Sequence, residues 1–216
     1  MTDPVTRRNF MRYAGLGILA LSLPRLPPSF LERNDYCSKE LGFSFEKPSD
    51  WRWVSAAELD EGREKAILPG GDEAKREAIE LAGLPLLIAT KYPQPQRGPT
   101  LVLWRQPAMS WQHAGADNVG FAKEHTRSYR LYRQWLKDYH VQKARPTTFA
   151  RLPGSCCVAT FVEEDNEGGS WPVRLESNMI RWRDSWLTFN FLDLKTGWDS
   201  AARADFTAIA TSLSFV

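Results

Sequence analysis

The sequence has few cysteines and histidines and no excess of either charge sign. Its 216 residues include three Cys and three His, while 43% of positions are hydrophobic, 25% charged and 12% aromatic. This composition excludes a disordered, collagen-like or disulfide-dense chain and is typical of a folded soluble domain. The formal charge is +2, but residues 1–28 hold four Arg and one acid, which leaves 24 basic and 25 acidic side chains elsewhere. The folded part therefore lacks the basic surface expected of a nucleic-acid-binding protein.

Motifs for cofactor, metal or nucleophile chemistry are also missing. The chain has no Gly-x-Gly-x-x-Gly, no phosphate-binding Gly-Lys-Ser/Thr and no Gly-x-Ser-x-Gly. His113, His125 and His140 stand apart, without the His-x-His or His-x-x-x-His spacing that brings metal ligands together. We therefore expect no metal site and no cofactor, and we assign no catalytic residue.

The N-terminal segment has the layout of a secretory signal peptide. A basic stretch is followed by an apolar run over residues 13–23 and then by a proline-rich end. An apolar run of eleven residues spans about half of a bilayer core, which needs roughly 20 helical residues, so a lasting transmembrane anchor is not expected.

The basic stretch resembles a twin-arginine signal, whose pattern is Ser/Thr-Arg-Arg-x-Phe-Leu-Lys. Arg7, Arg8 and Phe10 carry the pattern here, inside Thr-Arg-Arg-Asn-Phe-Met-Arg. We expect residues 1–28 to be the signal peptide, with an undefined cleavage point. The resemblance implies a periplasmic or extracellular protein exported by the twin-arginine route.

Export would place the three cysteines in a compartment where disulfides persist. Their odd number leaves one unpaired in a monomer. Two interpretations stay open: a disulfide between Cys37 and either Cys156 or Cys157, or three small buried apolar side chains. A catalytic thiol is not expected, because no His lies beside these residues in the sequence and no Cys-x-x-Cys occurs.

The hydrophobic pattern predicts an α+β fold, in which helices pack on an antiparallel sheet. The strands are expected over residues 41–48, 50–54, 85–92, 99–106, 147–150, 156–164, 172–183 and 186–192. The helices are expected over residues 73–82, 117–141 and 200–211. Short turns between the strands favour an antiparallel sheet over a doubly wound parallel one. Residues 29–40 are interpreted as a linker and residues 41–216 as one domain.

The pattern also predicts one buried helix face and the positions of three turns. Along the helix 117–141, one stripe carries Phe121, His125, Ser128, Tyr132, Trp135 and Tyr139. Gly154-Ser155 and Gly168-Gly169-Ser170 are interpreted as turns. The hairpin 172–192 is expected to turn at residues 183–185.

Several short motifs resemble the PsbP/DcrB-like family. The opening Gly42-Phe43-Ser44-Phe45-x-x-Pro48-x-x-Trp51 is similar to a glycine-aromatic strand that meets a Pro-x-x-Trp turn in that family. The hairpin over residues 85–106 and the closing Phe206-x-x-Ile209-x-x-Ser212-Leu213-x-Phe215 are similar to later parts of the pattern. The resemblance implies an α-β-α sandwich. It also implies an exported or lumenal protein that binds or stabilises a larger assembly, and it carries over no catalytic or ligand residue.

Two classes of function remain. The first is a noncatalytic binding or assembly protein of the cell envelope, with a protein partner and no nucleic acid. Its predicted contact surface is the hairpin turn with Arg183 and Trp186, because Arg and aromatic side chains are frequent binding anchors. The alternative is a periplasmic hydrolase or redox enzyme whose site is assembled from distant residues such as His140, Cys157 and Glu163. The two classes are distinguished by whether these three side chains meet in one cleft.

Overall fold

The structure is a computed structural model that describes residues 28–55, 57–58, 85–93, 98–107, 118–134, 136–164, 168–194 and 200–215. The predicted signal peptide with Arg7, Arg8 and Phe10, the predicted helix 73–82, and Trp135 lie outside these residues. The elements, in chain order, are α2 (Pro28–Leu31), β1 (Asp35–Ser38), β2 (Phe43–Glu46), β3 (Arg52–Trp53), β4 (Pro85–Thr90), β5 (Thr100–Pro107), α5 (Asn118–Arg130), the 3-10 helix η3 (Leu131–Gln134), β6 (Lys137–Val141), β7 (Arg145–Phe149), β8 (Leu152–Glu164), β9 (Ser170–Trp182), β10 (Ser185–Leu194), α6 (Ser200–Ser212) and β11 (Ser214–Phe215).

The strands form one large and one small antiparallel sheet. The large sheet has the order β3-β4-β5-β10-β9-β8-β6, and β7 also pairs with β8. The small sheet has the order β1-β2-β11. Every pairing among the described strands is antiparallel. The predicted antiparallel α+β fold is therefore confirmed.

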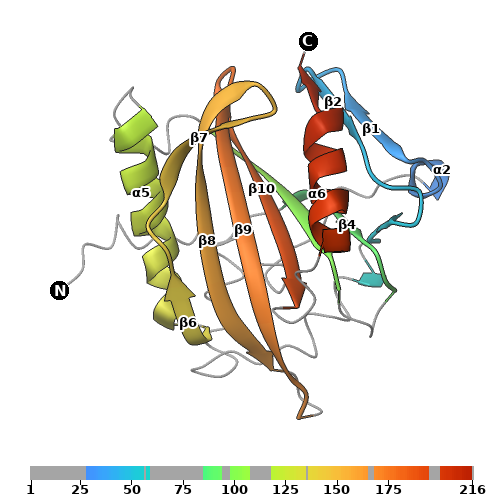
Figure 1. Ribbon diagram of the computed structural model, residues 1–216. Coiled ribbons are helices and arrows are strands. Elements are labelled where there is room, and N and C mark those ends of the chain that lie inside the picture. Colours follow the sequence, from blue (N-terminus) through green and yellow to red (C-terminus); the bar gives the residue numbers. More distant parts are fainter. Residues whose placement is uncertain are drawn as a thin grey trace.

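The helices α5 and α6 cover opposite faces of the large sheet (Figure 1). The Tyr129 hydroxyl of α5 lies 2.9 Å from Asn190 Oδ1 on β10, whereas the Phe206 ring of α6 lies 4.6 Å from the Phe191 ring on the same strand. Neighbouring residues of a strand point to opposite faces, so these two contacts place one helix on each face. The sheet lies between helices, as the resemblance to the PsbP/DcrB-like family implies. None of the described helices is long and apolar enough to cross a membrane.

A hydrophobic core of the described residues lies on the α6 side of the sheet. It joins strand residues to α6 and to the small sheet, and its members include Phe43, Phe45, Trp51, Trp53, Leu87, Leu101, Leu103, Phe189, Phe191, Phe206 and Ile209. Each of these side chains is at least nine-tenths buried. Four of the aromatic residues come from the motifs that resemble the PsbP/DcrB-like family, so the aromatic residues of those motifs are part of the hydrophobic core.

Residues 29–40 are part of the fold and not the predicted linker. β1 pairs with β2 over four residues. The Phe30 and Trp53 rings lie 5.4 Å apart, and the Trp53 indole donates a hydrogen bond of 2.7 Å to the carbonyl of Arg33. The apolar residues of this segment were too widely spaced to indicate a strand, and only the pairing with β2 gives them a buried face.

The predicted helix 117–141 ends earlier than its aromatic stripe suggests. α5 ends at Arg130, η3 follows, and the chain enters β6 at Lys137. Tyr132 and Tyr139 are both buried, with rings 5.8 Å apart, but Tyr139 lies on a strand. Asp138 has a φ of 50°, which a continuing right-handed helix does not accommodate. Of the stripe residues whose burial the structure describes, His125, Tyr132 and Tyr139 are buried, but the stripe did not predict the reversal of the chain.

One predicted turn is misplaced. Gly154-Ser155 lies inside β8, and the chain turns instead at Ala150 and Arg151, between the paired residues Phe149 and Leu152. Gly154 serves close packing, because a Cβ there would lie 2.3 Å from the carbonyl oxygen of Met179. The predicted turn at Gly168-Gly169-Ser170 is consistent with the structure at Gly168, which has a φ of 84°, whereas Ser170 is the first residue of β9.

Candidate binding groove

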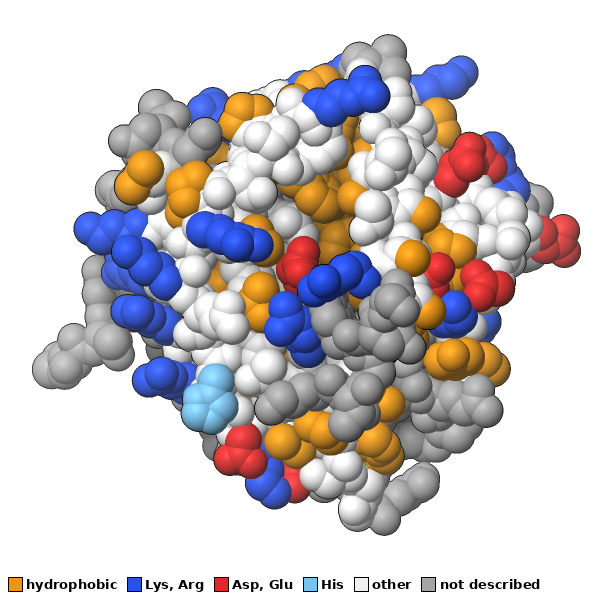
Figure 2. Space-filling view, viewed as in Figure 1, with side chains coloured by type: hydrophobic (Ala, Val, Ile, Leu, Met, Phe, Trp, Pro, Cys, Tyr) orange, Lys and Arg blue, Asp and Glu red, His pale blue; other side chains and the backbone are white. Residues whose placement is uncertain are grey.

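A groove of about 670 Å³ lies between α6 and the β7–β8 hairpin, over β9 and β10. Phe149, Phe191 and Phe206 provide aromatic surface in it, and Leu213 extends that surface beyond α6. Figure 2 shows a hollow with hydrophobic side chains at its bottom and Lys and Arg side chains around its border. Its volume falls in the range of ligand-binding pockets, and its open side leaves room for a larger partner.

One stripe of α6 forms a wall of the groove. Arg203, Phe206, Thr207, Ala210 and Thr211 follow the three- and four-residue spacing of a single helix face. The hydroxyls of Thr207 and Thr211 donate hydrogen bonds of 2.8 Å to carbonyls one turn earlier in the helix. These hydroxyl protons are therefore bound within the helix. The wall beyond Arg203 consists largely of small side chains, which let a ligand approach the helix closely.

The groove carries more positive than negative charge. Arg145, Arg151 and Arg203 line it and are exposed, and Glu176 is the acid among the described lining residues. Among the described residues, none of the three guanidinium groups forms an ion pair. Glu176 accepts a long hydrogen bond of 3.3 Å from the buried amide of Asn178. The concave surface thus has three guanidinium groups for an anionic ligand, of which that of Arg145 also interacts with the Cys156 thiol.

The turn that carries Arg151 is strained. Ala150 has a φ of 49° and Arg151 a φ of 68°, so both central residues of this two-residue hairpin turn are left-handed. Asn-Gly or Asp-Gly is usual in such a turn, because a left-handed conformation costs other residues about 1–2 kcal/mol. Strained backbone of this kind gathers at functional sites. The turn places Arg151 at the groove border at a cost in stability.

On the opposite face of the sheet, α5 is joined to three strands by buried polar side chains. His125 Nδ1 lies 2.6 Å from Ser155 Oγ, and its Nε2 lies 3.1 Å from Ser177 Oγ. The Tyr129 hydroxyl lies 2.8 Å from Ser177 Oγ and 2.9 Å from Asn190 Oδ1. All five side chains are buried.

The Tyr129 hydroxyl is placed to donate to Ser177 Oγ and to Asn190 Oδ1, and its single proton serves one of these acceptors at a time. The direction of the two contacts of His125 with Ser155 and Ser177 follows from the tautomer of the imidazole.

Burial keeps the titratable groups of this network neutral. The pKa of His125 is lowered to about 3 because the fully buried imidazolium would lose its water, and the pKa of Tyr129 is raised because burial likewise disfavours its phenolate. A neutral histidine without solvent access has no route for exchanging protons with a substrate. The network therefore fixes α5 on the sheet through hydrogen bonds between neutral groups.

The three cysteines are free thiols, and the disulfide left open by the sequence is not formed. Cys37 is exposed on β1, whereas Cys156 and Cys157 are buried on β8. Cys157 Sγ donates a hydrogen bond of 3.4 Å to the carbonyl of Gln142. Burial raises the pKa of Cys156 to about 11 and that of Cys157 to about 12, which disfavours the reactive thiolate. Cys156 and Cys157 fit the second interpretation, in which the cysteines are small buried side chains, but the exposed Cys37 does not.

The predicted contact surface at Arg183 and Trp186 needs correction. Trp186 is only 8% exposed, and the Arg181 guanidinium lies 5.9 Å from the centre of its ring. Trp186 is therefore a buried residue of β10 and not an exposed anchor. Arg183 is exposed, but its guanidinium lies over the Trp182 ring, 5.4 Å from the ring centre, and 3.4 Å from the carbonyl of Glu40.

The three residues named for the alternative enzyme do not meet. Cys157 and Glu163 share one face of β8 but are six residues apart, or about 20 Å along a strand. His140 is exposed and pairs with Thr160, whose side chain points to the opposite face of β8. In the part of the chain that the structure describes, no group of three or more His, Cys, Asp or Glu side chains is placed to hold a metal ion.

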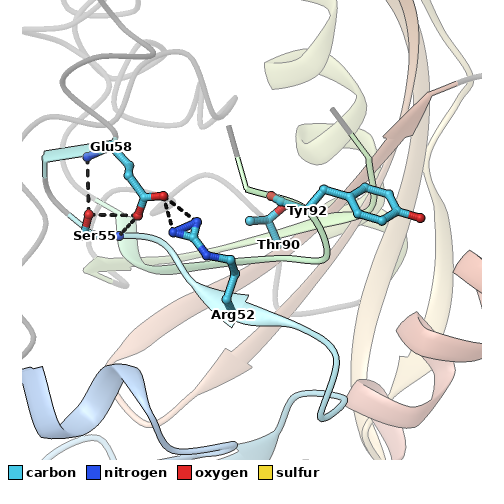
Figure 3. Close-up of polar contacts among 5 residues, drawn as sticks. All are labelled: Arg52, Ser55, Glu58, Thr90 and Tyr92. Atoms are coloured by element: carbon cyan, nitrogen blue, oxygen red, sulfur yellow. Dashed lines mark hydrogen bonds and ion pairs between the residues drawn. The ribbon is translucent and has the colours of Figure 1, made fainter. Parts of the chain in front are cut away.

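A polar cluster at the end of β3 was not recognised from the sequence. The Glu58 carboxylate accepts hydrogen bonds from the backbone N–H and the hydroxyl of Ser55, at 3.0 and 2.8 Å, and pairs with Arg52 (Figure 3). The backbone N–H of Glu58 returns a bond of 3.3 Å to the Ser55 hydroxyl. This reciprocal pattern is a capping box, and the Ser-x-x-Glu spacing would have revealed it. It fixes the start of a helical turn and has no link to the groove.

The comparisons with known proteins concern structure. No family model matches the chain, and no curated protein matches its sequence. It is similar to the cyanobacterial PsbP (CyanoP) of Synechocystis sp., with a TM-score of 0.46, 11% identity, and coverage of 84% of this chain and 91% of that one. It is similar to LpqN of Mycobacterium tuberculosis, a protein involved in cell envelope biogenesis, with a TM-score of 0.42, 11% identity, and coverage of 89% and 99%.

A third similar structure is the Ran-binding protein Mog1p of Saccharomyces cerevisiae. Its TM-score is 0.44 and its identity 7%, with coverage of 84% of this chain and 94% of that one. At such identities these similarities concern the fold alone.

Proposed function

We propose that this chain is an exported, noncatalytic binding or assembly protein of the cell envelope, which holds a partner protein in the groove between α6 and the β7–β8 hairpin. The observation that carries the proposal is the groove itself, with an aromatic floor and three arginines that form no ion pair among the described residues. Aromatic and Arg side chains together supply contact area and directional hydrogen bonds.

The state of the buried nucleophiles and bases supports a noncatalytic role. His125, Cys156 and Cys157 have pKa values moved by burial away from the range in which they would act at neutral pH. None of them lines the groove. The groove therefore has arginines and aromatic side chains that can bind a partner, and none of these three residues among its lining.

Export is supported by the signal-like pattern around Arg7 and Arg8. The receptor of the twin-arginine route reads paired guanidinium groups, which ammonium groups do not reproduce. Changing both residues to Lys should therefore leave the precursor inside the cell, as judged by fractionation. Equal export of the wild type and the double-Lys variant would contradict this part of the proposal.

Binding at the groove can be tested in the cells that make the protein. The photo-crosslinking residue p-benzoylphenylalanine is placed at Thr207, on the groove wall, or at Ala208, which is exposed on the same helix and lies outside the groove. We expect the full chain to form a discrete crosslinked product from position 207 and not from 208. Products of equal yield from both positions, or none from 207, would contradict the proposal.

A further inference from the structure

From the groove we infer the chemical class of the partner: an extended acidic peptide segment with an aromatic or large aliphatic side chain between its carboxylates. The inference rests on the proposed function, because it names what the same groove would bind. Three features of the described residues support it: the length of the groove, its arginines without ion pairs among these residues, and the Glu176 carboxylate in its interior.

The length of the groove suits a short extended segment. Its α6 side runs from Arg203 to Leu213, which is about 15 Å at the helical rise of 1.5 Å per residue. An extended chain covers that length with about five residues. Small side chains at Thr207 and Ala210 let a backbone approach the helix closely.

The charges of the groove select carboxylates on two opposing sides. Arg203 comes from α6, and Arg151 comes from the β7–β8 turn across the groove; Arg145 adds a third guanidinium on the β7 side. Guanidinium groups bind carboxylates in a bidentate geometry, with charge-assisted hydrogen bonds. Phe149 and Phe206 line the groove between two such contacts, where the small exposed part of each ring, less than a tenth of the residue, can meet an apolar side chain.

Glu176 favours a peptide over a phosphate or a lipid headgroup. This half-buried carboxylate lines the same groove, where it would repel a compact phosphate. A peptide backbone instead brings N–H groups, which donate to a carboxylate. The side-chain amide of Asn178 both donates and accepts hydrogen bonds, so it can also bond to the backbone of such a peptide. The combination of three cations with one interior acceptor therefore fits a peptide that is acidic in its side chains and carries N–H donors in its backbone.

The strained turn is consistent with this assignment. Glycine would adopt the left-handed backbone of positions 150 and 151 with less strain than Ala or Arg. A glycine at position 151, however, would bring no guanidinium group to the groove. Binding of a carboxylate by the Arg151 side chain would thus explain why a strained residue occupies this turn.

The test is a selection from a phage-displayed library of random twelve-residue peptides on the full chain. Three forms of the protein are compared: wild type, Arg151→Glu/Arg203→Glu, and a control with the same charge change, Arg130→Glu/Lys143→Glu, at exposed residues outside the groove. The milder pair Arg151→Gln/Arg203→Gln replaces the first variant if circular dichroism shows that charge reversal prevents folding. In a parallel arm, the same proteins are mixed with vesicles of phosphatidylcholine alone or with phosphatidylglycerol.

We expect the wild type and the control to enrich peptides that combine acidic with aromatic or large aliphatic residues, and the groove variant to lose them. A synthetic copy of an enriched peptide should bind the groove variant about tenfold more weakly in fluorescence anisotropy. Replacing its acids with amides should weaken its binding to the wild type to a similar degree.

Other results would overturn the inference in distinguishable ways. Groove-dependent enrichment of peptides without acids, or groove-dependent binding to phosphatidylglycerol vesicles alone, would contradict the acidic peptide and leave the groove as a binding site. Equal behaviour of the groove variant and the wild type in both arms would contradict the acidic peptide and the proposed function together.

Discussion

The guanidinium of Arg183 lies directly over Gly42: a Cβ added at Gly42 would lie 2.2 Å from Arg183 Nη2. Gly42 precedes β2 with a φ of 66°, and Arg183 lies in the β9–β10 turn with a φ of 53°. The Trp182 indole donates a hydrogen bond of 2.8 Å to the carbonyl of Leu41 in the same place. The small sheet is thus joined to the large one by contacts between two turns.

Gly42→Ala should destabilise the protein by about 1–2 kcal/mol from its left-handed backbone, with a further cost from moving the Arg183 guanidinium. Gly168→Ala is the matched control, because Gly168 also has a positive φ but a Cβ added there would meet no described atom within 4 Å. Urea denaturation of both variants separates the two costs. Equal losses of unfolding free energy would show that the contact with Arg183 adds nothing.

Tyr129→Phe should lower the free energy of unfolding by about 1–3 kcal/mol, because Ser177 and Asn190 each lose a buried hydrogen bond. Tyr139→Phe provides the comparison. The Tyr139 hydroxyl is buried and has no hydrogen-bond partner among the described residues, so its removal should cost little. Thermal melts of the two variants in parallel measure the difference, and a larger loss for Tyr139→Phe would argue against the network.

Stability should fall with acid over a pH window set by His125. Its pKa is about 3 in the folded protein, against an ordinary value of 6.5. Between these values the unfolded chain binds a proton that the folded protein does not, so stability is lost as the pH falls below about 6.5. The expected loss from this group between pH 7 and pH 5 is about 2 kcal/mol.

The pH prediction is checked by urea denaturation at both pH values. His125→Gln should remove this part of the pH dependence, while His140→Gln, at an exposed site, should retain it. If the wild type and His125→Gln lost the same free energy between pH 7 and pH 5, the buried neutral histidine would not be the cause.

Arg151→Gly should make the protein more stable and reduce its binding. Glycine accepts the φ of 68° without strain, which gives a gain of about 0.5–1 kcal/mol after its larger entropy loss on folding. The same change removes one guanidinium from the groove. Ala150→Gly should change stability in the same direction without loss of binding. Thermal melts together with crosslinking from Thr207 measure both effects; unchanged binding by Arg151→Gly would contradict a role for this side chain.

Much of the fold could be predicted from the sequence, because local patterns determine it. The strands β4, β5, β8, β9 and β10 and the helix α6 lie close to the expected ranges. The errors occur where local pattern and tertiary structure disagree. Tyr139 is buried both in the predicted helix and in the observed strand, so its burial could not distinguish them. The β7–β8 turn contains no Gly, Asn or Asp, so its composition did not indicate a turn.

The groove could not be predicted in this way. Arg151 and Arg203 are far apart in the sequence, and only the packing of α6 beside the β7–β8 hairpin places them on one concave surface. The three- and four-residue spacing of Arg203, Phe206 and Thr207 was readable, but it marks a helix face without showing what lies opposite. The predicted surface at Trp186 was wrong for the same reason, because exposure depends on what covers each face of the sheet.

The most direct test of the groove as the binding site is the yield of crosslinked partner from p-benzoylphenylalanine at Thr207, measured in cells for two charge-reversed proteins. If the groove arginines hold the partner, Arg151→Glu/Arg203→Glu should lose the crosslinked product, while Arg130→Glu/Lys143→Glu, at equal net charge and equal expression, should keep it. Equal yields from the two proteins would contradict the account.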